Sequence, residues 1–236
     1  MNNIIWIASF DIGSVNFAFY IEEIDIAKMK DIKNISKLKR YNPNGTCTSD
    51  FLEIIKKIYK NGKKILLKNF NLTQNIDKKK YFDIELCHNM NDLLDTFKEY
   101  WDNVSYFIVE QQMSFGKKNN TKALKLAQNC ESYFMFHYGR FKKVIEFPAY
   151  YKTQILGCEK IEKKTKTGKI NYKNIDQRAR KKWGIEEGIF VFVERDDFET
   201  ITEISSYKKL DDMYDCVIQM QAFKYLYFID NFEKLY

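Results

Sequence analysis

Residues 4–18 read IIWIASFDIGSVNFA, and this stretch decides how the chain begins to fold. An apolar, β-prone run extends from Ile4 to Phe10 and ends at Asp11, with Gly13 two positions later. A second apolar run begins at Phe17 and continues to residue 21. Two apolar runs separated by a short turn that contains glycine predict a β-hairpin. We therefore expect the chain to open with two strands, the first of which ends at an aspartate.

The composition is that of a folded chain. Hydrophobic residues make up 45% of the 236 residues, and only two are proline, so a substantial core is expected and a proline-rich disordered chain is not. We interpret residues 1–236 as a single domain. Residues 25–80 are rich in Lys and Asn and are interpreted as an insertion, partly helical, with a strand at residues 64–70. Residues 158–206 are interpreted as a basic loop and helix segment.

Charge and cysteine usage limit the classes of partner and compartment. The chain has 39 Lys and Arg against 32 Asp and Glu, a net charge of +7, which suits a polyanionic partner but equally fits a basic soluble protein. Five cysteines without a CxxC pair indicate reduced thiols in an intracellular compartment. The neighbours Cys87 and His88 lack a second ligand pair, so a zinc site is not predicted. No apolar run approaches the ~20 residues of a membrane span, and the N-terminus does not resemble a signal peptide.

The rest of the chain alternates between strand and helix patterns. Apolar runs predict strands at residues 81–87, 104–109 and 142–147. Helical spacing of apolar residues predicts helices at residues 90–101, 122–138 and 207–228, a short helix after Pro148, a Lys-rich loop at residues 160–173 and a basic helix at residues 175–183. A hairpin followed by strand–helix crossovers indicates an α/β domain with a mixed sheet.

Acidic residues stand at the ends of three of these apolar elements. Asp11 ends the first strand, Glu110 follows the strand at residues 104–109, and the last helix carries Asp211, Asp212 and Asp215. Singly, each has a structural explanation as a turn residue, a strand-end charge or a first-turn residue favoured by the helix dipole. Together they suit phosphodiester hydrolysis, in which two divalent cations held by carboxylates activate water and stabilise the leaving oxygen. Helix geometry alone does not choose between Asp211 and Asp212, because both are neighbours of Asp215.

Four sequence blocks resemble those of a known family. Residues 9–18, SFDIGSVNFA, resemble a strand that ends in Asp-x-Gly-x-x-Asn-x-Ala, and residues 109–112, VEQQ, resemble Ile-Glu-x-Gln. Residues 208–215, KKLDDMYD, resemble Lys-Lys-x-Asp-Asp-x-x-Asp, and Phe147-Pro148 followed by Lys152 resembles a post-strand Pro and Lys segment. These blocks, in this order, are similar to those of Holliday junction resolvases of the RuvC and poxvirus type, in the RNase H-like superfamily.

The resemblance implies a fold, a reaction and a set of ligands. The expected fold is the α/β RNase H-like (ribonuclease H/RuvC) fold, with a mixed central sheet flanked by helices. The implied catalytic and metal-binding residues are Asp11, Glu110, Asp212 and Asp215, which would hold two Mg²⁺ or Mn²⁺ ions. The implied partner is branched DNA, which a homodimer would bind. No membrane partner is implied. A virus factory in the cytoplasm is the favoured location, with the mitochondrion as the alternative. The chain departs from the family in its longer residues 25–80 and in Tyr214, where an alanine is common.

Basic residues near these blocks are candidates for contacts with the DNA backbone. They are Lys117, Lys118, Lys122, Lys152, Lys163, Lys164, Lys166, Lys208 and Lys209. A solvated surface is the competing interpretation. Two other functions stay open: another RNase H-like nuclease that cuts RNA–DNA hybrids or flaps, and a nucleic-acid-binding protein without catalysis. Glu110 directly follows a strand, which favours the resolvase arrangement over that of cellular ribonuclease H.

Overall fold

The computed structural model describes residues 3–77, 79–112, 120–165, 167–207 and 209–230. The chain forms two compact units. The first comprises Met1–Ile24 and Lys63–Ala149, and the second comprises Asp25–Gly62 and Tyr150–Tyr236. None of the described helices combines the length and the apolar character that a membrane crossing requires.

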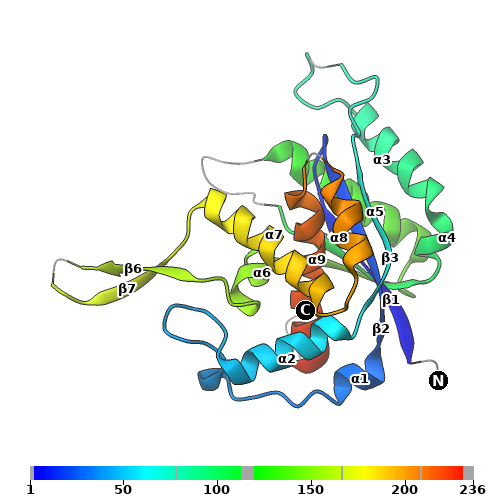
Figure 1. The fold of residues 1–236 in the computed structure, drawn as a ribbon. Helices are drawn as coiled ribbons and strands as arrows, with labels where there is room; N and C mark the ends of the chain where they lie inside the picture. The colour runs from blue at the N-terminus through cyan, green and yellow to red at the C-terminus, as the bar shows by residue number, and fades with distance from the viewer. Residues whose placement is uncertain (1–2, 78, 113–119, 166, 208, 231–236) are drawn as a thin grey trace. The chain divides into compact units, whose positions relative to one another are not determined.

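The first unit is built on a five-stranded mixed sheet (Figure 1). Its strands are β1 (Ile4–Asp11), β2 (Phe17–Asp25), β3 (Lys63–Phe70), β4 (Val104–Glu110) and β5 (Lys143–Phe147), in the order β3-β2-β1-β4-β5. Strand β4 runs parallel to both β1 and β5, and β2 runs antiparallel to β3. Only five residues join β1 to β2, which is far too few for a parallel crossover, so this pair is a hairpin. The mixed α/β sheet and the opening hairpin predicted from the sequence are confirmed.

The turn between β1 and β2 requires its glycine. A Cβ atom added at Gly13 would lie 2.6 Å from the carbonyl oxygen of Asn16, closer than side-chain carbons approach backbone. The same turn is held from outside by Leu72, whose amide donates to the carbonyl oxygen of Ser14 at 2.8 Å. The residue that ends β1, Asp11, therefore enters a turn of fixed shape.

Helices α3 (Glu85–Thr96), α4 (Lys98–Trp101) and α5 (Thr121–Tyr138) supply the side chains that pack with one face of this sheet. Aromatic rings dominate the core: Phe107 of β4 stacks on Phe134 of α5 with ring centroids 3.9 Å apart, and Trp101 lies against Phe10. Burying each such side chain stabilises the fold by roughly 1.5–3 kcal/mol. This core accounts for part of the high aromatic content of the sequence.

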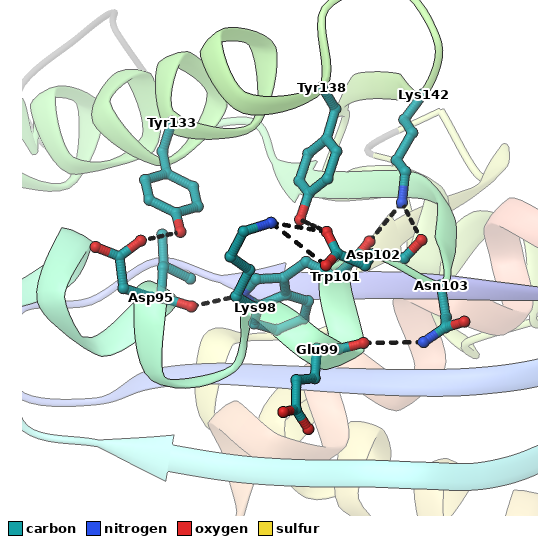
Figure 2. Close-up of polar contacts among 10 residues, drawn as sticks. Asp95, Lys98, Glu99, Trp101, Asp102, Asn103, Tyr133, Tyr138 and Lys142 are labelled. Carbon is teal, nitrogen blue, oxygen red and sulfur yellow. Dashed lines mark hydrogen bonds and ion pairs between the residues drawn. The ribbon is translucent and has the colours of Figure 1, made fainter.

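Polar groups fix α4 between its neighbours (Figure 2). Tyr133 and Tyr138 of α5 donate hydrogen bonds to Asp95 at 2.5 Å and to Asp102 at 2.9 Å. The ammonium of Lys142 donates to the carbonyl oxygens of Trp101 and Asp102, both at 2.6 Å, and so satisfies acceptors at the end of α4. Burial lowers the pKa of Lys142, although Asp102 opposes that shift.

The second unit is mostly helical. It contains α1 (Ile26–Lys30), the 3₁₀ turn η1 (Lys37–Lys39), α2 (Ser49–Lys60), α6 (Tyr150–Ile155), α7 (Gln177–Val193), α8 (Phe198–Ser205), α9 (Asp211–Lys224) and the π-helical turn η2 (Tyr225–Ile229). It also contains a two-stranded ribbon of β6 (Lys160–Lys164) and β7 (Ile170–Asn174). Helix α9 is buried on almost every side and packs against α2, α6 and α7. Its last residue, Lys224, donates to the carbonyl oxygens of Ile58 and Asn61 at the end of α2.

Two helices predicted from the sequence differ in extent from those of the structure. The helix expected to end at residue 183 continues to Val193 as α7, because its glycines allow close packing against α9. A Cβ at Gly188 would lie 2.4 Å from Cδ1 of Tyr214, so this glycine allows α7 and α9 to pack closely and does not end α7. The last helix begins at Asp211 and not at residue 207.

The other corrections concern strands. The strand expected at residues 81–87 is absent from these described residues, and α3 begins at Glu85, where Asp83 accepts a hydrogen bond from the Glu85 amide at 3.3 Å. The Lys-rich loop expected at residues 160–173 is instead the β6–β7 ribbon. Its turn is closed by Gly168, with φ +81°, and by the Gly168 amide, which donates to the Thr165 carbonyl at 3.0 Å. Hydrogen bonds between the two strands hold this ribbon together, and it has no buried apolar face. Its sequence therefore lacks the apolar alternation of a strand and resembles that of a loop.

Candidate active site

Two of the predicted carboxylates end neighbouring parallel strands. Phe10 of β1 pairs with Val109 of β4, and the next residue of each strand is Asp11 and Glu110. Parallel strands lie about 4.8 Å apart, and residues in register project from the same face. Asp11 and Glu110 are both half-buried. The sheet therefore brings these two carboxylates together at the carboxyl ends of β1 and β4, where they occupy the same register position.

The chain beyond Glu110 is anchored to the next strand. The Gln111 amide donates to the carbonyl oxygen of Phe147 at 2.8 Å, and the Gln111 side chain donates to Glu146 at 3.2 Å. Gln112, which matches the glutamine of the Glu-x-Gln motif, donates from its side chain to the carbonyl oxygen of Glu110 at 3.2 Å. The two glutamines of the motif thus fix the backbone that carries Glu110.

The other predicted carboxylates lie at the start of α9 in the second unit. Asp211 and Asp212 are in its first turn, and Asp215 is one turn further along. Asp212 is buried, with 9% of its surface exposed, whereas Asp211 and Asp215 are half-buried. Burial raises the pKa of Asp212, and the nearby charge of Asp211 raises it further, while Lys209 opposes the shift.

Every aspartate of α9 forms an ion pair with a lysine. The ammonium of Lys209 lies 2.5 Å from Asp212 and that of Lys152, on α6, lies 3.4 Å from Asp215. Asp211 is ion-paired with Lys181 of α7. The sequence gives no local signal of the contact between Lys181 and Asp211, because the two residues are thirty positions apart. Asp211 thus joins α9 to α7, and the ammonium of Lys209 also lies 4.0 Å from it.

Lys152 differs in its burial from the other basic candidates that the structure describes. Only 7% of its side chain is exposed, and a buried ammonium is stable only when it is paired with a counter-charge or with acceptors. Lys163 and Lys164 are exposed on β6, and Lys122 is exposed at the start of α5. Lys209 is partly exposed and bonded to Asp212. The remaining candidates, Lys117, Lys118, Lys166 and Lys208, lie outside the described residues.

The four predicted metal ligands fall into two pairs, one in each unit: Asp11 with Glu110, and Asp212 with Asp215. Within either unit, the described residues contain no group of three or more His, Cys, Asp and Glu side chains that could by itself hold a metal ion. The donor set nevertheless fits the implied ions, because carboxylate oxygens are the ligands that Mg²⁺ and Mn²⁺ prefer. The lysines that contact Asp212 and Asp215 compensate part of the charge that these carboxylates carry.

Comparisons with known proteins place the chain in a family. The sheet and helices define a protein of the RNase H-like fold. The fowlpox virus resolvase, solved in complex with its substrate Holliday junction DNA, has this architecture. The two chains are 18% identical, with a TM-score of 0.50, and the match covers 93% of this chain and 97% of that one. No family model matches the sequence. Protein 170L of Invertebrate iridescent virus 6 is 35% identical over 96% of this chain and 92% of its own length. The chain belongs to the family of that protein, which extends to protein 97L of Invertebrate iridescent virus 3, 26% identical over 92% of this chain and 98% of that protein.

Proposed function

We propose that this protein is a metal-dependent endonuclease that resolves four-way DNA junctions, with Asp11, Glu110, Asp212 and Asp215 as its catalytic carboxylates. The observation that carries the proposal is the register of β1 and β4, which sets Asp11 and Glu110 side by side at the ends of adjacent parallel strands. Both residues stand in the sequence blocks that resemble the resolvase motifs, and so do the two aspartates of α9.

The four carboxylates would hold two Mg²⁺ or Mn²⁺ ions. When bound, such ions activate a water molecule for attack on the phosphodiester and stabilise the leaving oxygen. The chain's own residues hold the ligands in place. Gln112 fixes the backbone of Glu110, Lys209 contacts Asp212, and Lys152 contacts Asp215. These contacts restrict the carboxylates to a small set of positions before substrate binds, as catalysis by positioned groups requires.

Branched DNA is the substrate class that the fold and the charge support best. The fowlpox virus enzyme that shares this fold was solved with Holliday junction DNA. The net charge of +7 favours a polyanionic partner. A four-way junction has near-twofold symmetry, so two opposed cuts require two identical sites in fixed relation, which a homodimer supplies.

The exposed apolar residues at the end of α5 are a candidate interface for that dimer. Phe136 is 87% exposed, and Met135 and Phe141 are also exposed. A helix that directs Phe134 into the core cannot direct Phe136 there as well, because two residues along a helix correspond to about 200° of rotation. The five cysteines, all among the described residues, form no disulfide, which favours action in a reducing compartment such as the cytoplasm of an infected cell.

Cleavage of synthetic substrates tests the function directly. The protein should cut a four-way junction in the presence of Mg²⁺ and cut matched linear duplex, flap and RNA–DNA hybrid substrates at least tenfold more slowly. Asp11→Asn serves as the control for contaminating nucleases. Faster cleavage of the hybrid would replace the resolvase proposal with a ribonuclease H activity, and junction binding without cleavage under any divalent cation would indicate a binding protein.

A further inference from the structure

The β6–β7 ribbon is an exposed element of the second unit. The two strands pair in antiparallel register over five residues each and extend away from the helices of that unit (Figure 1). Lys160 is half-buried at the base of the ribbon, and the other residues of both strands are exposed. The amide of Lys160 donates to the carbonyl oxygen of Asn44 at 2.7 Å, which anchors the base to the loop before α2.

The pairing register sorts the ribbon's side chains into two faces. Residues directly opposite each other in an antiparallel pair project from the same face, and successive residues alternate. The pairs Ile161↔Lys173 and Lys163↔Asn171 therefore share one face, which we call the lysine face. The pairs Lys160↔Asn174, Glu162↔Tyr172 and Lys164↔Ile170 share the other, which we call the mixed face. Lys163 and Lys164, adjacent in sequence, thus point in opposite directions.

The two faces differ in charge. The lysine face carries Lys163 and Lys173 and no carboxylate, whereas the mixed face carries Glu162 among its lysines. A carboxylate on a contact surface repels phosphate, so the lysine face is the better match for a polyanion.

The two faces also differ in what lies next to them. Three residues of the mixed face, Lys160, Glu162 and Tyr172, line a shallow hollow together with Pro43 and Asn44 of the loop before α2. Of the lysine face, only Ile161 lines that hollow. The mixed face is therefore turned toward the body of its own unit, and the lysine face is left for a partner.

We propose that the lysine face of the β6–β7 ribbon lies along the groove of a duplex arm of the DNA junction, with Lys163 and Lys173 contacting phosphates. A two-stranded ribbon has the width that the major groove of B-DNA admits. Lys163 and Lys173 are diagonal neighbours across the ribbon, roughly 7–8 Å apart, so they reach different phosphates. Phosphate contacts position a protein on DNA without reading its sequence, so the contact suits an enzyme that selects DNA by shape. This inference rests on the proposed junction-resolving function and assigns one of its binding surfaces.

A pair of neighbouring substitutions tests the assignment. Lys163→Ala and Lys164→Ala each remove one positive charge from the same strand, but from opposite faces. Both are made in the Asp11→Asn protein, which should bind without cutting, and binding to a fluorescent four-way junction is measured across a salt series. Lys163→Ala should weaken binding several-fold and lower the log–log salt slope by about 0.9, and Lys163→Ala with Lys173→Ala should lower it by about 1.8. Lys164 was a candidate DNA contact on sequence grounds, but it lies on the mixed face, so Lys164→Ala should leave affinity within about twofold. The losses should be the same for arms of different base sequence.

Each of three results would contradict part of the proposed contact between the ribbon and DNA. Equal losses for Lys163→Ala and Lys164→Ala would overturn the face assignment and indicate diffuse attraction to the whole ribbon. No loss for either variant would overturn the ribbon as a DNA contact. A loss confined to one arm sequence would overturn the phosphate contact in favour of base recognition. All three can occur while the wild-type protein cuts four-way junctions, so they are distinguishable from failure of the proposed function, in which the wild-type protein neither binds nor cuts the junction.

Discussion

The ammonium of Lys152 lies 3.4 Å from Oδ1 of Asp215, with 7% of the lysine side chain exposed. This contact joins α6 to α9 and connects the segment after Pro148 to the helix that begins with the predicted catalytic aspartates. A lysine buried against a carboxylate is poorly placed to reach a DNA phosphate. We therefore expect Lys152 to act through Asp215, in contrast to its assignment as a DNA contact on sequence grounds.

Replacing Lys152 by Met should separate these two roles. The substitution keeps most of the side-chain volume and removes the charge, so Asp215 loses a partner. We expect junction cleavage to fall at least tenfold, affinity for the junction to stay within about twofold, and the free energy of unfolding to fall by about 1–3 kcal/mol, since the pair is only partly buried. Single-turnover cleavage, equilibrium binding and urea unfolding measure the three quantities. A large loss of affinity with a normal cleavage rate at saturation would restore the direct DNA contact.

Asp11→Asn should abolish cleavage and leave binding intact. The amide is almost the same size as the carboxylate but lacks its negative charge, so it removes a metal ligand with little change in packing. Excess EDTA should have the same effect on the wild-type protein, and added Mg²⁺ or Mn²⁺ should restore its activity. Gel assays of cleavage and of binding in Ca²⁺ provide the measurement. Substantial cleavage by Asp11→Asn, or in EDTA, would contradict the metal-dependent mechanism.

The two adjacent aspartates of α9 should respond differently to the same change. Asp212→Asn should reduce cleavage by two orders of magnitude or more, as expected for loss of a ligand that positions a reacting group. Asp211→Asn should reduce it less than tenfold, because Asp211 is ion-paired with Lys181 of α7 and serves to hold the helices together. The two variants are matched controls for one another. A larger loss of cleavage in Asp211→Asn than in Asp212→Asn would make Asp211 the catalytic residue in place of Asp212.

The positions of two candidate carboxylates in the fold could be predicted from the sequence because these residues lie at the ends of strands. Asp11 and Glu110 each follow an apolar strand, and such boundaries are visible as a change from apolar to polar residues. The distinction between Asp211 and Asp212 could not be predicted in this way. It depends on Lys181 and Lys209, and the Lys181 contact joins two helices thirty positions apart in the chain.

The errors in the fold have a common physical origin. Local patterns report burial and turn chemistry, but not contacts between distant segments. Gly184 and Gly188 look like helix breakers, yet α7 continues through them because Tyr214 of α9 occupies the space of a side chain at Gly188. The β6–β7 ribbon has no buried face, so it lacks the apolar alternation by which strands are recognised. Its two strands are specified instead by the hydrogen bonds they make with each other.

Lys142 should stabilise the fold without contributing to DNA binding. Its ammonium donates to two carbonyl oxygens at the end of α4 (Figure 2). Lys142→Met should therefore lower the free energy of unfolding by about 1.5–3 kcal/mol, the contribution of hydrogen bonds from a charged donor. The control is Lys28→Met. The side chain of Lys28 is 74% exposed and its ammonium lies 4.0 Å from Asp25, so its replacement should lower the free energy of unfolding by less than about 1 kcal/mol. Urea unfolding of both variants checks the difference, and equal stabilities would show that Lys142 contributes no more than a surface ion pair.

Coordinated resolution of a junction would depend on assembly of the protein as a dimer. Phe136 is 87% exposed on α5, and an apolar ring in water is the kind of residue that anchors a subunit interface. Phe136→Asp should convert a homodimer to monomers, which light scattering measures. Leu38→Asp is the matched control, because Leu38 is 94% exposed on η1 in the second unit and should leave the dimer intact.

The same two variants should differ in how they cut a supercoiled plasmid that extrudes a cruciform. A dimer makes both nicks within one binding event, so the wild-type protein and Leu38→Asp should yield linear DNA directly. A monomer makes one nick, which releases the supercoiling that supports the cruciform, so Phe136→Asp should accumulate nicked circles. Linear product from a monomeric Phe136→Asp protein would show that the two cuts do not require this interface. A monomeric wild-type protein that yields only nicked circles would instead define the enzyme as an RNase H-like nickase.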